Sequence, residues 1–250
     1  DCGWGCCYRC AQGIISKYMM LLHSINPTLI ATNFNHIENT LSLFLDTDEA
    51  PFSIQNLVKE TSKIGVSIGQ WAKPSQVAQA FGNIFEKYNI PYYFSYDCII
   101  EPSKLQQAKY PMILMVSLMC SLASQFDESF FPFMKYIFSL KEIIGIVSGY
   151  SGSAYYIVKI NDSEEVFYFD PHVCQPAAVS SDSFDTFFNQ KVMKMPLSQL
   201  NPSILMAFIC TDYKNACELV TKLVEFPNSP ISFSEKISYQ ILDLDDLDLQ

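Results

Sequence analysis

The spacing of the apolar residues changes along the chain from a helical period to an extended one and back, which restricts the possible folds more than any other feature. Helices are expected over residues 6–24, where apolar side chains recur every three or four positions, over 75–88 with Ser75 as the N-cap, and over 213–226. Strands are expected over residues 92–96, 112–119, 143–147, 154–160, 166–169 and 204–210. The sequence therefore predicts an α+β protein.

The body of the chain reads as one domain. The strands over 154–160 and 166–169 flank a polar turn and are expected to form a hairpin. The uncharged stretch 111–126 is interrupted by serines and is interpreted as a buried strand and its exit, not as a membrane span. With 250 residues and no internal repeat, we expect one domain over residues 1–233 and an acidic, partner-binding tail over 234–250, where Asp alternates with Leu and Ile.

Charge and cysteine content narrow the class of protein. The formal net charge is −10, so we expect no binding to nucleic acid. The nine cysteines follow no disulfide framework, which favours reduced thiols and a cytoplasmic location. We expect a soluble monomer that needs no cofactor and no metal. The chain opens at Asp1 rather than Met and has no signal peptide, so we expect that an upstream segment is missing from this numbering.

Three histidines are available as a general base. His23 falls late in the first expected helix and His36 in a polar loop, and both are interpreted as ordinary surface or capping residues. His172 instead follows a predicted strand directly, in Asp170-Pro171-His172, and side chains two apart in an extended segment point to the same side. Asp170 and His172 are therefore expected to face one site, where the carboxylate would fix the tautomer of the imidazole.

The candidate nucleophile is Cys6, which follows Gly3-Trp4-Gly5 at the start of the first expected helix. A cysteine in the first helical turn has its thiolate stabilised by free backbone amides, which could also serve as an oxyanion hole. Two other interpretations stay open, a zinc cluster that uses Cys7 and Cys10 and a redox pair formed by the same two cysteines. Catalysis by a cysteine and a histidine is favoured, because zinc lacks a second ligand pair at a suitable spacing.

Four blocks together resemble the autophagins, the autophagy-related protein 4 family of cysteine proteases. They are Gly3-Trp4-Gly5-Cys6 with Arg9 and Gln12, Ser67 to Trp71 with Pro74, the stretch from Gly145 through Ser153-Ala154 to Asp170-Pro171-His172 and Gln175-Pro176, and Leu200-Asn201-Pro202-Ser203. The resemblance spans most of the chain. It implies a papain-like cysteine protease fold, in which the helix of the nucleophile packs against an antiparallel sheet.

The resemblance also implies catalytic roles and a substrate. Cys6 is the implied nucleophile, His172 the general base and then acid, and Asp170 the residue that orients His172. The implied substrate is a ubiquitin-like autophagy modifier of the GABARAP type, which is cut after its C-terminal glycine during precursor processing. The same activity would release the modifier from phosphatidylethanolamine, with transient contact to the membranes that carry it.

Substrate-binding residues follow from the same resemblance. Trp71 would form one wall of a channel that admits only glycine, and the loop from Ser148 to Gly152 a movable lid, which makes Gly149, Tyr150, Ser151 and Gly152 substrate-binding candidates. This loop lacks the family's usual Lys-Pro-Asn run, so we expect the lid to move differently. If the family's segment ahead of the nucleophile is absent, the loss of its oxyanion tyrosine would lower the rate by roughly 10²- to 10³-fold.

The tail and the neighbour of the nucleophile add two hypotheses. Tyr239 and Leu242, three apart and followed by acidic residues, resemble the short motif that adds a strand to the sheet of the modifier and fills two pockets. Cys7, beside the nucleophile, makes redox control a hypothesis.

Three alternative functions stay open. A Ufm-type modifier-specific protease shares the Gly-Trp-Gly-Cys start and the Asp-Pro-His run, but the Ser67 to Trp71 block together with Gln175-Pro176 favours the autophagins. A catalytically impaired homologue would only bind the modifier. A zinc or disulfide-exchange protein would instead use Cys7 and Cys10.

Overall fold

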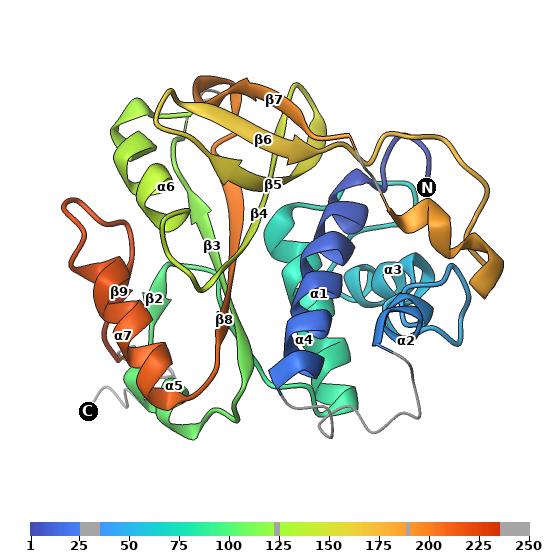
Figure 1. Ribbon diagram of the computed structural model, residues 1–250, viewed down its shortest axis with the longest axis horizontal. Coiled ribbons are helices and arrows are strands. Elements are labelled where there is room, and N and C mark those ends of the chain that lie inside the picture. The colour runs from blue at the N-terminus through green and yellow to red at the C-terminus, as the bar shows by residue number, and fades with distance from the viewer. Residues whose placement is uncertain (26–35, 123–125, 189–190, 236–250) are drawn as a thin grey trace, which may run out of the picture.

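The structure is a computed structural model that describes residues 1–25, 36–122, 126–188 and 191–235 (Figure 1). Within these residues, seven strands form one sheet in the order β1-β3-β8-β4-β5-β6-β7, while β2 and β9 pair separately. Neighbours in the large sheet are antiparallel except β1 and β3, which are parallel. The strands are β1 (Tyr92–Ser95), β2 (Ile99–Ile100), β3 (Met112–Met119), β4 (Ile143–Tyr150), β5 (Ser153–Ile160), β6 (Glu165–Phe169), β7 (Met193–Pro196), β8 (Ser203–Cys210) and β9 (Ser232–Phe233).

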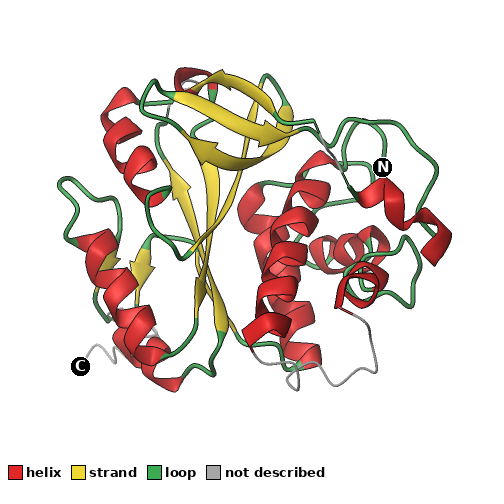
Figure 2. Ribbon diagram, in the orientation of Figure 1, coloured by secondary structure: helices red, strands yellow, loops and turns green. Residues whose placement is uncertain are grey.

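Helices cover both faces of the large sheet (Figures 1 and 2). Helices α1 and α4 pack on one face, with α3 packed on α4, and α5, α6 and α7 contribute to the core on the other face. The helices are α1 (Cys6–Ile25), α2 (His36–Ser42), α3 (Ile54–Ser62), α4 (Pro74–Tyr88), α5 (Pro102–Gln107), α6 (Phe131–Ile137) and α7 (Tyr213–Val224). Among the described residues, no helix is both long enough and apolar enough to span a bilayer.

Strand β3 explains the uncharged run of the sequence. Met112 and Leu114 belong to the core beneath α6 and α7, whereas Ile113 and Met115 belong to the core beneath α1 and α4. Because successive side chains of a strand point to opposite faces, a strand that is covered on both sides is apolar at nearly every position, and Ser117 is the exception in β3. The prediction of a buried strand in this stretch is confirmed.

Helix α1 lies against β4 and β5, on the face of the sheet that it shares with α4 (Figure 1). Its apolar stripe, including Ala11, Ile14 and Leu22, is buried, as the helical period predicted. The hydroxyl of Tyr18, also buried, donates a hydrogen bond to the carbonyl oxygen of Pro91 at 3.0 Å, so the polar atom is satisfied. The predicted α+β architecture, with the Cys6 helix packed on an antiparallel sheet, is confirmed.

Several predicted boundaries are wrong. Helix α4 begins at Pro74 with Lys73 as its N-cap, not with Ser75 as the cap, because proline is favoured at the first helical position. His36 begins helix α2 and does not lie in a loop. The last helix, α7, ends at Val224, two residues earlier than expected.

The expected lid, residues 148–152, is not a loop. Strand β4 continues through Tyr150, and only Ser151 and Gly152 form the turn that leads into β5. Both turn residues have positive φ, +48° and +83°, which defines a type I′ hairpin.

The expected hairpin, β5 and β6, is present, and its polar turn lies where the sequence predicts it. The Glu165 backbone N–H donates to the side-chain oxygen of Asn161 at 2.8 Å and so closes that turn.

The start of the predicted tail touches the body. Glu235 accepts hydrogen bonds from the backbone N–H and the hydroxyl of Ser103, both at 2.8 Å. Tyr239 and Leu242, the residues of the predicted modifier-binding motif, lie outside the described residues.

Candidate active site

Cys6 is the first residue of α1 and lies directly after the Gly3-Trp4-Gly5 approach. The backbone N–H of Gly5 donates to the carbonyl oxygen of Asp1 at 2.9 Å, and the N–H of Arg9 donates to the carbonyl oxygen of Gly5 at 3.1 Å, where the helical hydrogen bonds begin. The amides of the first helical turn have no partner within a helix and favour negative charge. The partly exposed thiol of Cys6 therefore lies where a thiolate and an oxyanion would both be stabilised.

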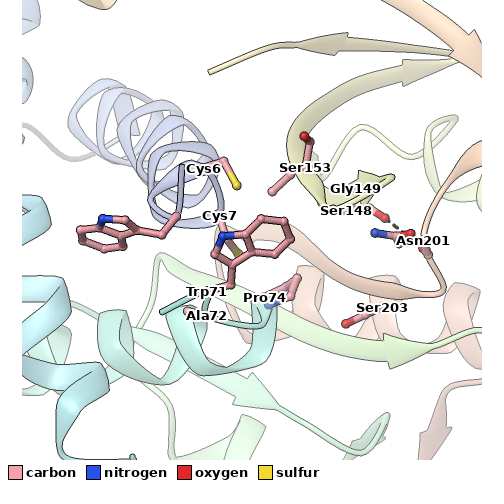
Figure 3. A pocket seen from close by; sticks show the side chains of 13 residues that line it. Cys6, Cys7, Trp71, Ala72, Pro74, Ser148, Gly149, Ser153, Asn201 and Ser203 are labelled. Atoms are coloured by element: carbon pink, nitrogen blue, oxygen red, sulfur yellow. Dashed lines mark hydrogen bonds between the residues drawn. The ribbon is translucent and has the colours of Figure 1, made fainter. Parts of the chain in front are cut away.

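Cys6 lines a pocket between the helical half of the protein and one end of the sheet (Figure 3). The helical half contributes Trp4, Cys6, Cys7, Trp71, Ala72 and Pro74, and the sheet contributes Ser148, Gly149, Gly152, Ser153, Ala154, Asn201 and Ser203. In the close view, the side chain of Cys6 leaves the helix toward the gap between the Trp71 ring and Ser153. A peptide laid between the two halves would therefore pass the thiol.

Trp71 forms one wall of this pocket, and its position is fixed from two sides. The side chain is 59% exposed, but its indole N–H donates to the carbonyl oxygen of Gly3 at 2.6 Å. The ring also lies against the turn of the β4–β5 hairpin, where a Cβ on Gly152 would come within 2.7 Å of its Cη2 atom. The turn needs glycine at this position, both for its positive φ and for the closeness of the ring.

The other predicted lid residues divide into two groups. Gly149 lines the pocket, and a Cβ there would overlap the carbonyl oxygen of Ser153 across the hairpin. Tyr150 and Ser151 point to solvent at the tip and are not among the residues that line the pocket. The hairpin end is held by Asn201, whose backbone N–H donates to the carbonyl oxygen of Gly149 at 2.7 Å.

Asp170 and His172 form a hydrogen-bonded pair, as the alternation along the strand predicted. His172 Nδ1 lies 2.6 Å from Asp170 Oδ1, and the backbone N–H of His172 donates to the same oxygen at 2.9 Å. A carboxylate can only accept, so Nδ1 carries the proton and Nε2 is left to accept one. The ring of Tyr155, on β5, packs edge-on against the imidazole with the ring centres 5.8 Å apart. The imidazole is therefore oriented from two directions.

The pair of Asp170 and His172 lies near the helix that begins with Cys6. Burial first, then the neighbouring thiols and then the charge of Asp170 raise the pKa of Cys10 well above its usual range. The ring of Phe169, the residue before Asp170, packs on Tyr156 of β5 with the ring centres 6.1 Å apart, and Tyr156 in turn lies against Gly13 of α1. The sheet thus brings the end of β6, from which Asp170 and His172 follow, close to the helix that begins with Cys6.

The neighbouring cysteines have a different environment. Cys7 and Cys10 are both buried, and burial raises the pKa of each thiol. Buried, protonated thiols react slowly in disulfide exchange and with peroxide, which argues against the exchange interpretation and against redox control through Cys7. In the described part of the chain, no group of three or more His, Cys, Asp or Glu side chains could hold a metal ion.

A helix that begins at a cysteine and packs on an antiparallel sheet with a His–Asp pair is the arrangement of the papain-like cysteine peptidases. The Peptidase C54 catalytic domain family matches residues 1–222 of the chain. The chain therefore belongs to the peptidase C54 family, the autophagins that the motifs resemble. This membership sets aside the Ufm-type alternative.

Curated relatives agree with the family. The chain is 26% identical over 232 residues to the probable cysteine protease atg4 of Botryotinia fuckeliana, an alignment that covers 85% of the chain and 52% of the relative. It is 25% identical over 274 residues to the cysteine protease ATG4B of Gallus gallus, with 89% and 69% covered. The chain thus spans about half to two thirds of the length of these relatives.

Three residues that line the pocket were not predicted as site residues. They are Trp4, Pro74 and Asn201, and all three stand in motifs that carry the family resemblance. The motif spacing pointed to their segments, but only the fold brings the three segments together.

Proposed function

We propose that this chain is a cysteine endopeptidase that cleaves a ubiquitin-like autophagy modifier after its C-terminal glycine. The observation that carries the proposal is the pocket in which Cys6, at the start of a helix, faces Trp71 and a glycine-lined hairpin end. The hydrogen-bonded pair of Asp170 and His172 beside the same helix supports it. The names of the relatives, which are cysteine proteases of the Atg4 type, agree with this assignment.

In the proposed reaction, Nε2 of His172 takes the proton from the Cys6 thiol, while Asp170 stabilises the imidazolium that forms. The thiolate attacks the carbonyl carbon of the glycine, and the backbone amides at the start of α1 stabilise the oxyanion. His172 then donates its proton to the leaving amine, and a thioester of Cys6 with the glycine remains. Water, deprotonated by His172, hydrolyses the thioester and frees the glycine carboxylate.

The pocket walls support selection of glycine. A Cβ on Gly152 would come within 2.7 Å of the Trp71 ring, so these two walls lie close together, and a glycine in the substrate needs no room for a side chain. Selection by the walls alone would be modest, since one methyl group in a pocket is worth roughly 1–3 kcal/mol. We therefore propose that contacts with the folded body of the modifier supply the remaining selectivity.

The same chemistry would also release a modifier from phosphatidylethanolamine, because that lipid is joined to the glycine through an amide. The leaving group is then the amine of the lipid, and the enzyme meets the membrane only through its substrate. We place this activity in the cytoplasm, in a monomeric enzyme, with Tyr239 and Leu242 in the tail as a second contact to the modifier.

Cleavage of a modifier that carries a C-terminal extension after its glycine tests the proposal, with wild type and Cys6→Ala side by side. The expected result is a product that ends at the glycine by mass spectrometry, and no product with Cys6→Ala. Binding without cleavage by both proteins would instead identify a homologue that only binds the modifier. Vesicles that carry the modifier on phosphatidylethanolamine test the second activity in the same way.

A further inference from the structure

Arg9 lies three residues after Cys6 on α1 and forms a two-point ion pair with Asp46. One guanidinium nitrogen lies 2.8 Å from Oδ1 of Asp46, and the other donates to Oδ2 at 3.1 Å. The carboxylate is 7% exposed, so the pair is little screened by water. Arg9 also contacts Asp1 at 2.8 Å and Gln12 at 3.1 Å. The hydrogen bond from Arg9 to Oδ2 gives the pair a defined direction, because a charged donor and a charged acceptor form a strong hydrogen bond.

Asp46 in turn holds Ala178 through two hydrogen bonds. The backbone N–H of Asp46 donates to the carbonyl oxygen of Ala178 at 2.7 Å, and the N–H of Ala178 donates to Oδ2 of Asp46 at 3.3 Å. Ala178 is 4% exposed, whereas the rest of the stretch 173–179 is exposed. These two bonds join the exposed stretch 173–179 to Asp46.

The segment anchored at Ala178 begins at His172. Between these two residues the chain has no regular secondary structure, so its position depends on its ends. One end is held by the bonds of His172 to Asp170. The other end is held by Asp46, and through Asp46 by the helix that carries Cys6.

We propose that Arg9 and Asp46 are positioning residues of this peptidase: they dock the segment that follows His172 onto the nucleophile helix, and so hold the imidazole at its working distance from Cys6. This inference rests on the proposed function, because it assigns His172 as the general base. The ion pair touches neither substrate nor reacting atoms. Its effect is on the geometry of the step in which the thiol loses its proton, and small displacements there can cost roughly 100-fold in rate.

Two variants of Asp46 and one control separate positioning from simple stabilisation. Asp46→Ala removes the ion pair and the acceptor for the Ala178 N–H, whereas Asp46→Asn keeps an oxygen that can accept it. Asp48→Ala is the control, because it removes an exposed ion pair with Lys59 at 2.8 Å, two residues from Asp46. The kinetic constants are measured with the extended modifier, per active site counted by covalent labelling, so that unfolded protein does not contribute.

The expected result is a kcat that falls by roughly 10- to 100-fold in Asp46→Ala, with KM changed by less than about twofold. Asp46→Asn loses less, and Asp48→Ala matches wild type. Hydrogen exchange within residues 171–179 becomes faster in Asp46→Ala. An unchanged kcat per labelled site in Asp46→Ala, or an equal loss in Asp48→Ala, would overturn the inference while the proposed function stands. A wild-type protein that does not cleave would overturn the proposed function and this inference with it.

Discussion

Replacement of Asp170 by Asn isolates the charge of the residue that orients His172. Oδ1 of Asp170 accepts from two donors of His172, its Nδ1–H at 2.6 Å and its backbone N–H at 2.9 Å. The backbone donor cannot change its role, so it keeps the amide oxygen of Asp170→Asn at that position and turns the amide NH₂ away. The Nδ1–H bond and the tautomer of the imidazole then survive, and the variant loses only the negative charge.

The size of the effect follows from the same geometry. A hydrogen bond to a charged acceptor is worth roughly 1.5–3 kcal/mol, about twice a neutral one. Asp170→Asn keeps a neutral bond and loses about half of this value, and both side chains are 38% exposed, so a loss of roughly 0.75–1.5 kcal/mol is expected, which is about a 4- to 13-fold drop in kcat/KM. Asp170→Ala also removes the acceptor that fixes the tautomer, and a loss of roughly 10³- to 10⁴-fold is expected.

The assay is the kcat/KM for an extended modifier near neutral pH, measured for wild type and both variants. The account predicts an activity for Asp170→Asn that lies between those of wild type and Asp170→Ala. If Asp170→Asn were as inactive as Asp170→Ala, the amide oxygen would not be held by the backbone N–H. If it were fully active, the charge of the carboxylate would contribute nothing to the reaction.

Three further outcomes follow from the fold. Burial raises the pKa of Cys120 from 9.0 to about 12. Above pH 9 the thiol therefore ionises in the unfolded chain but stays protonated in the folded one. Its contribution to the free energy of unfolding is complete below pH 9 and is lost as the pH rises. Urea unfolding should show a loss of roughly 1 kcal/mol for this thiol between pH 9 and 10, and an equally steep pH dependence in Cys120→Ala would contradict it. Gly152→Ala should lower the free energy of unfolding by about 1 kcal/mol because of the positive φ, and it should push the Trp71 ring toward water. In a Trp4→Phe background this displacement is expected as a red shift of the tryptophan fluorescence. An unshifted spectrum would show that the ring does not rest on this turn. Ser53→Ala removes the buried N-cap of α3 and should lower the free energy of unfolding by about 1 kcal/mol with kcat unchanged, so a changed kcat would count against a purely structural role.

The elements that the sequence predicts well are those long enough to show a full period. Helix α1 repeats its apolar stripe over five turns, and β3 is uncharged and apolar except at Ser117 because both faces are covered. Helices α2, α5 and α6 have six or seven residues, too few for a clear period, and they were not predicted. Strand β7 is similarly short and is held by its pairing with β6, a contact that local spacing does not reveal.

The site shows the same division between local and distant information. Asp170 and His172 are two residues apart, so alternation along a strand was enough to pair them. Trp71 and Gly152 came from the family resemblance, and only the fold brings the ring onto the turn. Arg9 stood in a recognised motif, but its partner Asp46 lies in a segment without periodicity, where no spacing rule points to a buried carboxylate.

The location of the nucleophile is the central claim, and a covalent trap tests it most directly. A modifier whose C-terminal glycine is replaced by a cysteine-reactive group of the same length is incubated with the chain, which has nine cysteines to choose from. The account predicts one adduct per chain, located at Cys6 by mass spectrometry of the digested protein, and strongly slowed in His172→Ala. An adduct at any other cysteine, or labelling of Cys6 at the same rate in His172→Ala, would contradict it.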